Sequence, residues 1–206
     1  MLFGIFVYDG VEPIDLATFG VLSMARRIAP QIEICTIAPK AGIVRLSNGL
    51  EIVAQFGIED APVCEVVIVT GGPGWEDQSR SPATLAYIRR VNASDKVASV
   101  CTGAMILAAS GVLDDRTATT KRAVVAPEVS PLARMREKYS RIDVREAPIV
   151  DSGGVVTGGG VSLCIDTTLH ILETLLGKHV ASETARILEY QRARAANMNT
   201  EAFLAR

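Results

Sequence analysis

Short apolar segments alternate with longer segments of helical character along most of this chain. Four of the apolar segments are rich in valine and isoleucine, and most are bounded by glycine, proline or aspartate, which is typical of buried β-strands. They cover residues 2–8, 32–38, 65–70 and 97–100. Helices are expected over residues 14–28, 81–91, 103–110, 161–176 and 179–191. Strands that alternate with helices predict βαβ units, and therefore an α/β fold with a mostly parallel sheet sandwiched by helices.

Two further segments break this alternation and predict small β-hairpin additions. Residues 44–54 contain an Asn-Gly dipeptide, which favours a tight turn between antiparallel strands. The sequence IVDSGGVVT at residues 149–157 predicts a second strand pair. The chain has 206 residues, a length that suits one domain. We therefore expect a single α/β domain over residues 1–190, followed by a helical extension or tail over residues 191–206.

The composition is that of a folded protein with ordinary charge. Hydrophobic residues make up 49% of the chain and the net charge is −2. This charge gives no electrostatic footprint for nucleic acid, so we expect no nucleic-acid partner. The apolar N-terminus, MLFGIFVYDG, lacks a basic leader and is interpreted as a first strand, not a signal peptide. No apolar run approaches the roughly 18 residues that a membrane span requires, so we expect no membrane association.

The cysteines and histidines of the chain do not form a recognisable ligand set. The four cysteines are far apart and include no CxxC pair, which favours reduced thiols in the cytoplasm over a disulfide framework or a zinc site. Neither of the two histidines, His170 and His179, lies near another ligand in the sequence. We therefore expect no metal site and no cofactor.

Cys101 lies where an apolar strand is expected to turn into a helix. In the sequence SVCTG, the small residues Ser99 and Gly103 stand two positions before and after the cysteine, as in a nucleophile elbow. Such a turn exposes a thiol at a helix N-terminus, where unpaired N–H groups and the helix dipole favour the thiolate. A buried, inert cysteine fits this local pattern equally well. The remaining cysteines lie within or beside apolar segments and are expected to be inert: Cys35, Cys64 and Cys164.

The sequence TGGPG at residues 70–74 follows directly after a predicted buried strand. Glycines at the carboxyl end of a strand allow backbone N–H groups to turn toward a ligand, as in an oxyanion hole, although a simple tight turn fits as well. This loop is not a dinucleotide fingerprint, because the glycine required at position 77 is replaced by Asp77. The TGGG sequence at residues 157–160 fails in the same way at Leu163.

Asp15 follows the first predicted strand, in the sequence DGVEPIDL. A carboxylate at the start of a helix is most often an N-cap or first-turn residue. Parallel strands end at the same edge of a sheet, however, and ligands bind there, so Asp15 could also face Cys101 and exchange a proton with a substrate. Glu12, three residues earlier, is a competing candidate for that role.

No histidine is placed to activate the thiol. Cysteine hydrolases of the Cys-His type need an imidazole beside the sulfur, but Thr102 follows Cys101 and no histidine precedes His170. His170 lies within a predicted helix, where ordinary packing is expected. The sequence therefore argues against a conventional Cys-His triad.

Four stretches of sequence together resemble the ThiJ/PfpI superfamily, the flavodoxin-like relatives of class I glutamine amidotransferases. They are DGVEPIDL, VIVTGGPG, SVCTGAMILAASGVLDDRTATT and VVTGGGVSLCID. Within the superfamily the chain is most similar to the isonitrile hydratase branch and to the ligand domains of amidase-like AraC regulators. The resemblance spans residues 2–190. It implies a flavodoxin-like fold and a homodimer.

The resemblance also implies roles for individual residues. Cys101 would be the nucleophile and Asp15 its acidic partner, with oxyanion-type backbone donors at Thr102 and Gly72. PfpI-type proteases have histidine directly after the nucleophile, so Thr102 argues against peptidase activity. Further glycines are candidates for the pocket: Gly71, Gly103 and Gly160.

Two departures from the branch lie near the expected pocket. The branch commonly has D-L-x-G-P where this chain has DLATF at residues 15–19. It also commonly has ATTHW where this chain has ATTKR, so Lys121 and Arg122 replace the usual His-Trp. The identity of the substrate therefore stays open.

These observations predict a cysteine-dependent lyase that acts on a small molecule. The reaction expected from the resemblance converts an isonitrile to an N-substituted formamide through a thioimidate on Cys101. Two alternatives are a ligand-binding protein without catalysis and a redox sensor in which Cys101 is oxidised.

Overall fold

A computed structural model describes residues 1–93 and 97–198 of the chain. Its centre is a seven-stranded sheet with the order β10-β11-β7-β6-β1-β2-β5. Every neighbouring pair is parallel except β10 and β11. The strands are β1 (Leu2–Phe6), β2 (Glu33–Ala38), β5 (Phe56–Gly57), β6 (Val66–Val69), β7 (Val97–Ser99), β10 (Ile149–Asp151) and β11 (Val155–Gly158).

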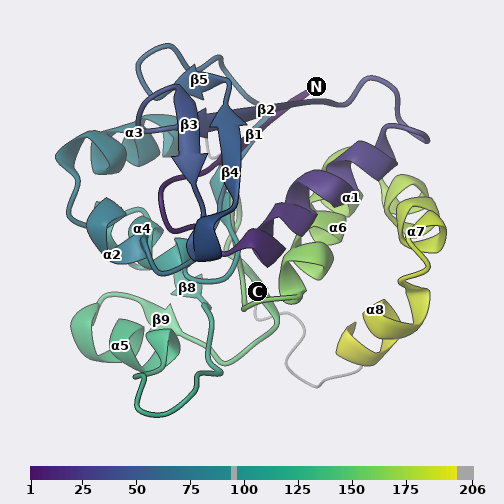
Figure 1. The fold of residues 1–206 in the computed structure, drawn as a ribbon. Coiled ribbons are helices and arrows are strands. Elements are labelled where there is room, and N and C mark those ends of the chain that lie inside the picture. The colour runs from purple at the N-terminus through teal and green to yellow at the C-terminus, as the bar shows by residue number, and fades with distance from the viewer. Residues whose placement is uncertain (94–96, 199–206) are drawn as a thin grey trace.

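Helices cover both faces of this sheet (Figure 1). On one face α1, α6 and α7 pack together, and on the other α2, α3 and α4 do so. The short helix α5 lies beside α4, and α8 packs against α7. Their bounds are α1 (Ala17–Ala25), α2 (Trp75–Gln78), α3 (Pro82–Asn92), α4 (Gly103–Ser110), α5 (Pro131–Lys138), α6 (Leu163–Leu176), α7 (Lys178–Ile187) and α8 (Gln191–Met198).

The predicted flavodoxin-like α/β fold is confirmed, and so are both small additions. Strands β3 (Gly42–Arg45) and β4 (Glu51–Ala54) form an antiparallel hairpin, and β10 pairs with β11 in the same sense. A third addition, the parallel pair β8 (Thr117–Ala118) and β9 (Asp143–Val144), is not indicated by the hydrophobic pattern. Two-residue strands carry too little periodicity to be recognised in a sequence.

Apolar side chains on both sides of the sheet explain why the strands are continuous hydrophobic runs. All four residues of β6, VVIV, are buried, as expected for a parallel strand between two helical layers. Helix α4 is buried on nearly every side, with only Ala109 partly accessible, which explains its apolar sequence GAMILAAS. This central position of α4 fixes its N-terminus, and with it Cys101, at the carboxyl end of β7.

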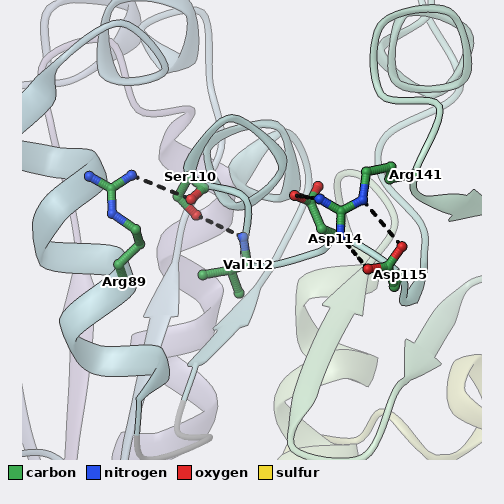
Figure 2. Close-up of polar contacts among 6 residues, drawn as sticks. All are labelled: Arg89, Ser110, Val112, Asp114, Asp115 and Arg141. Atoms are coloured by element: carbon green, nitrogen blue, oxygen red, sulfur yellow. Dashed lines mark hydrogen bonds and ion pairs between the residues drawn. The ribbon is translucent and has the colours of Figure 1, made fainter.

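The far end of α4 is closed by polar contacts (Figure 2). Gly111 caps the helix with a left-handed backbone, at φ 81°. Arg89 donates to the carbonyl of Ser110 at 3.4 Å. Arg141 donates to Asp114 at 3.1 Å and also pairs with Asp115. The LAASGVLDDR stretch, which contributes strongly to the family resemblance, therefore ends the helix and anchors the following loop.

The chain after Gln191 begins as a helix, α8, and the predicted extension is helical as far as Met198. The rest of that predicted tail, residues 199–206, lies outside the described residues. No helix in the two described ranges is long and apolar enough to cross a membrane.

Candidate active site

Cys101 occupies a strained turn between β7 and α4. Its φ is 52°, a left-handed value that is costly for a residue with a side chain and that recurs at functional sites. Backbone contacts hold the turn: the Cys101 N–H donates to the Gly159 carbonyl at 3.0 Å, and Thr120 Oγ1 donates to the Cys101 carbonyl at 2.8 Å. The geometry is that of a nucleophile elbow.

Asp15 lies in the 3₁₀ turn η1 (Pro13–Leu16), but it does not cap a helix. Its Oδ2 accepts a hydrogen bond of 2.7 Å from the N–H of Gly71, in the glycine loop after β6. The side chain is fully buried, and among the described residues Oδ1 has no conventional hydrogen-bond donor. The Cys101 thiol interacts with this carboxyl and lowers the pKa of Asp15.

Burial dominates the ionisation of both groups. It raises the pKa of Asp15 to about 7, with a further rise from the charge of Glu12, against the Gly71 hydrogen bond that lowers it. Burial and the charge of Asp15 raise the pKa of the Cys101 thiol to about 12. The Thr102 N–H and the Lys121 ammonium act in the opposite direction. The expectation of an exposed thiol that ionises readily is therefore wrong, because desolvation outweighs the helix N-terminus.

The glycine loop packs too closely for side chains. A Cβ on Gly71 would lie 2.4 Å from the backbone nitrogen of Thr102. Gly72 has φ 135°, and its Cβ would lie 2.2 Å from the backbone nitrogen of Glu12. The loop thus brings the turn after β1 and the elbow after β7 into contact.

The two expected oxyanion donors are engaged within the protein. The Gly72 N–H donates to Thr102 Oγ1 at 2.8 Å, so it holds the threonine hydroxyl in place. The Thr102 N–H is directed at the Cys101 sulfur, where it lowers the pKa of the thiol. Both N–H groups are therefore directed at side chains of the elbow, Thr102 and Cys101.

Cys101, Thr102 and Gly72 line a cavity of about 450 Å³. Its wall mixes apolar and charged side chains, and Arg134 and Glu76 within it form an ion pair at 2.8 Å. The remaining lining residues are Glu12, Pro73, Trp75, Lys121, Val124, Glu128, Val129, Pro131 and Val161. A pocket of this size admits a small molecule with an apolar body.

The sequence profile of the DJ-1/PfpI family matches residues 4–174 of this chain. The chain belongs to the DJ-1/PfpI family. Among curated relatives, the isonitrile hydratase of Pseudomonas putida is 30% identical over 189 residues, which cover 91% of this chain and 77% of that protein. The HTH-type transcriptional regulator GlxA of Rhizobium meliloti is 29% identical over 161 residues, covering 76% of this chain and 45% of the regulator.

Solved structures of the family share this fold at low sequence identity. A ThiJ/PfpI family protein from Pseudomonas syringae superposes with a TM-score of 0.79 at 23% identity, covering 95% of this chain and 83% of that one. Drosophila melanogaster DJ-1beta gives a TM-score of 0.75 at 19% identity, covering 91% of this chain and 97% of that one. The DJ-1/PfpI fold is thus well matched over nearly the whole chain.

Lys121 of this DJ-1/PfpI protein lies in the wall of the Cys101 cavity. It lines both that cavity and a neighbouring one of about 350 Å³, and its ammonium donates to the carbonyl of Ala123. Arg122 lines only the neighbouring cavity and pairs with Glu146. Lys121 therefore lies where its charge lowers the pKa of the Cys101 thiol, whereas Arg122 is paired with Glu146.

The glycines expected around the pocket have different positions. Gly160 lines the neighbouring cavity, where its missing side chain leaves room for Lys121, since a Cβ would lie 2.6 Å from Lys121 Cγ. Gly71 and Gly103 are absent from the lining of the Cys101 cavity. The N–H of Gly103 donates to the Val100 carbonyl, and its α-carbon packs against the end of β6. Gly71 and Gly103 therefore act through close packing.

Several cavity residues were missed by sequence reasoning. Trp75, Val129 and Arg134 were not candidates in the sequence, and the fold brings them to the cavity at the elbow. His170, expected as helix packing, has a polar partner: its Nε2 lies 3.0 Å from Oδ2 of Asp151. The described residues contain no group of three or more His, Cys, Asp or Glu side chains that could hold a metal ion.

Proposed function

We propose that this protein is a cysteine-dependent hydratase that converts a small isonitrile, R–N≡C, to the formamide R–NH–CHO. One observation carries the proposal: the buried Asp15 carboxyl interacts with the Cys101 thiol, which lines a cavity of about 450 Å³. The similarity to the Pseudomonas putida isonitrile hydratase, at 30% identity, supports this choice of substrate class.

The first half of the reaction needs one proton to move from sulfur to carbon. Because the pKa of Asp15 is about 7, the carboxyl is partly ionised at neutral pH and can both accept and donate a proton. The carboxylate takes the proton of the Cys101 thiol as the sulfur attacks the terminal isonitrile carbon. Asp15 then delivers this proton to the same carbon, giving the thioimidate R–N=CH–S–Cys101.

The second half of the reaction consumes water. Water adds across the C=N bond and places hydroxyl on carbon and hydrogen on nitrogen. The C–S bond then breaks, the formamide leaves, and the hydroxyl proton returns to the sulfur. No imidazole is needed, since Asp15 can accept and donate the proton, and the Thr102 hydroxyl, held by the Gly72 N–H, lies beside the Cys101 sulfur.

The apolar part of the cavity lining favours an isonitrile with an apolar R group. Val124, Val129 and Val161 supply apolar wall, together with Trp75. Thr102 at the position after the nucleophile supports a hydratase over a protease, because a Cys-His pair cannot form there. A homodimer in the cytoplasm stays a prediction, and light scattering of the purified chain tests the dimer.

Incubation of the purified chain with alkyl and cycloalkyl isonitriles tests the proposal. We expect the matching formamide by NMR, and an enzyme adduct heavier by the mass of the isonitrile under rapid quench. Cys101→Ala should abolish both, whereas Cys164→Ala, which removes another buried thiol, should retain them. Absence of formamide from every isonitrile would refute the hydratase. Ligand binding that survives Cys101→Ala without turnover would instead favour a non-catalytic binding protein.

A further inference from the structure

A second pair of thiols is in contact on the sheet, away from the Cys101 cavity. Cys35 belongs to β2 and Cys64 to the loop before β6, and their sulfur atoms are 4.0 Å apart. Strand β1 lies between β2 and β6, with Gly4 opposite Cys35. A Cβ at position 4 would lie 2.9 Å from Cys64 Sγ. The absence of a side chain at Gly4 therefore makes room for the two sulfurs to meet over the central strand.

Cys64 also lines a surface cavity of about 240 Å³, and a residue of its wall carries a buried polar group that has no hydrogen-bond partner among the described residues. Tyr87, on α3, lines the same cavity and is only 4% exposed, yet its hydroxyl has no hydrogen-bond partner among the described residues. Arg90 completes the polar part of the wall, with its guanidinium 5.2 Å from the centre of the Tyr87 ring. A buried hydroxyl that lacks a protein partner can donate a hydrogen bond to a small polar ligand beside the thiol.

The two thiols differ in their access to that cavity. Cys64 lines it and Cys35 does not, so Cys35 lies behind Cys64. The contact between the two thiols lowers the pKa of Cys64, against burial, and raises the pKa of Cys35. Reactive cysteines have a favoured thiolate and an accessible sulfur, and they often lie beside a resolving thiol. Cys64, at the wall of the cavity, suits the role of the reactive cysteine, and Cys35 suits that of the resolving thiol.

We propose that Cys64 and Cys35 form a second reactive centre, a dithiol that is oxidised by hydrogen peroxide or a small alkyl hydroperoxide. The Cys64 sulfur attacks one peroxide oxygen, the O–O bond breaks, and the thiol proton leaves with the other oxygen as water or alcohol. Cys64 is then a sulfenic acid. The Cys35 thiol attacks the Cys64 sulfur and releases a second water, so one disulfide forms while the peroxide is reduced by two electrons.

The last step requires the sulfur atoms to approach by about 2 Å, since a disulfide bond is about 2.05 Å long. Cys35 is held by the pairing of β2 with β1, whereas Cys64 precedes the regular part of β6. The segment from Ala61 to Cys64 has no regular secondary structure, and Val63 within it is 91% exposed. This segment can therefore supply the movement.

Peroxide treatment of the full chain, followed by alkylation and peptide mass mapping, tests this proposal. We expect a cross-linked pair of peptides containing Cys35 and Cys64, lighter by two hydrogens and restored by a dithiol reductant. Cys35→Ser should stop the reaction at the Cys64 sulfenic acid, which dimedone traps. Tyr87→Phe should slow oxidation about fivefold, as expected for one lost hydrogen bond to the peroxide.

Two controls separate this centre from ordinary buried thiols and from the proposed hydratase. Cys164→Ser removes a buried cysteine elsewhere and should leave the cross-link unchanged. Gly4→Ala keeps both thiols but places a methyl group against the Cys64 sulfur, and it should suppress the cross-link. Isonitrile turnover should survive Cys64→Ser. The proposal is overturned if peroxide modifies Cys101 while Cys35 and Cys64 stay free thiols in the folded chain.

Discussion

The backbone N–H of Gly71 donates a hydrogen bond of 2.7 Å to Oδ2 of Asp15. Gly71 follows β6 and Asp15 follows β1, and these two strands are neighbours in the sheet. Cys101 follows β7, the other neighbour of β6. Three adjacent parallel strands therefore deliver the carboxyl, the glycine loop and the thiol to one edge of the sheet, where ligands bind in open α/β folds.

Asp15→Asn should reduce the turnover of an isonitrile by about 10²–10⁴-fold, because an amide cannot accept the thiol proton. The measurement is the rate of formamide release, with thermal unfolding as a check on folding. Glu12→Gln is the matched control, since Glu12 lines the Cys101 cavity and its charge raises the pKa of Asp15. A larger loss in Glu12→Gln than in Asp15→Asn would transfer the acid–base role to Glu12.

The contribution of Asp15 to the stability of the protein should fall as the pH rises from about 4 to about 7. The pKa of Asp15 is raised from 3.8 to about 7, so over this range the unfolded chain releases a proton that the folded chain retains. The stabilisation from protonated Asp15 is complete below pH 3.8 and is lost as the pH passes 7. At about 1.4 kcal/mol per pKa unit, the loss amounts to at most about 4 kcal/mol.

Urea denaturation of the parent and of Asp15→Asn across this range measures the effect. The variant should show a shallower fall with pH than the parent, and its relative stability should be greatest above pH 7. Identical slopes in the two proteins would contradict a raised pKa at Asp15.

Gly71→Ala should strongly destabilise the protein and abolish turnover. Its Cβ would lie 2.4 Å from the Thr102 nitrogen and 2.8 Å from Cys101 Cβ, both of which belong to the strained elbow. The free energy of unfolding should fall by about 1–3 kcal/mol, the usual cost of overpacking. Gly20→Ala is the control: this glycine lies in α1 with no atom within 4 Å of an added Cβ, and alanine there should be neutral or slightly stabilising. Equal effects of the two changes would refute the packing argument.

Lys121→Met should slow alkylation of Cys101 by iodoacetamide at a fixed pH. The ammonium group lowers the pKa of the thiol, and methionine keeps much of the side-chain volume without the charge. Arg122→Met serves as the comparison, because Arg122 is paired with Glu146 and lines only the neighbouring cavity. The rate is read by mass spectrometry of the Cys101 peptide. Unchanged alkylation in Lys121→Met would show that its charge does not reach the sulfur.

The sequence by itself determined most of the long strands and helices along the chain and the position of the elbow at Cys101. Both depend on local chemistry: the period of apolar residues, the small residues around the cysteine, and the glycines that follow β6. Thr102, next to the sulfur, likewise argues against a Cys-His pair without any knowledge of the fold. The two-residue strands β5, β8 and β9 were not predicted, because two residues carry no period, and helices α2 and α5 were not predicted either.

The tertiary structure alone decided how the site residues behave. The helix start favours a thiolate at Cys101, but burial by distant segments raises its pKa. Asp15 looks like a helix cap in the sequence, yet its oxygen is used by Gly71, from a loop 56 positions away. Cys35 and Cys64 look like separate core residues until Gly4 on the strand between them lets them touch. Desolvation and contacts across strands depend on residues far apart in the chain, so no local pattern encodes them.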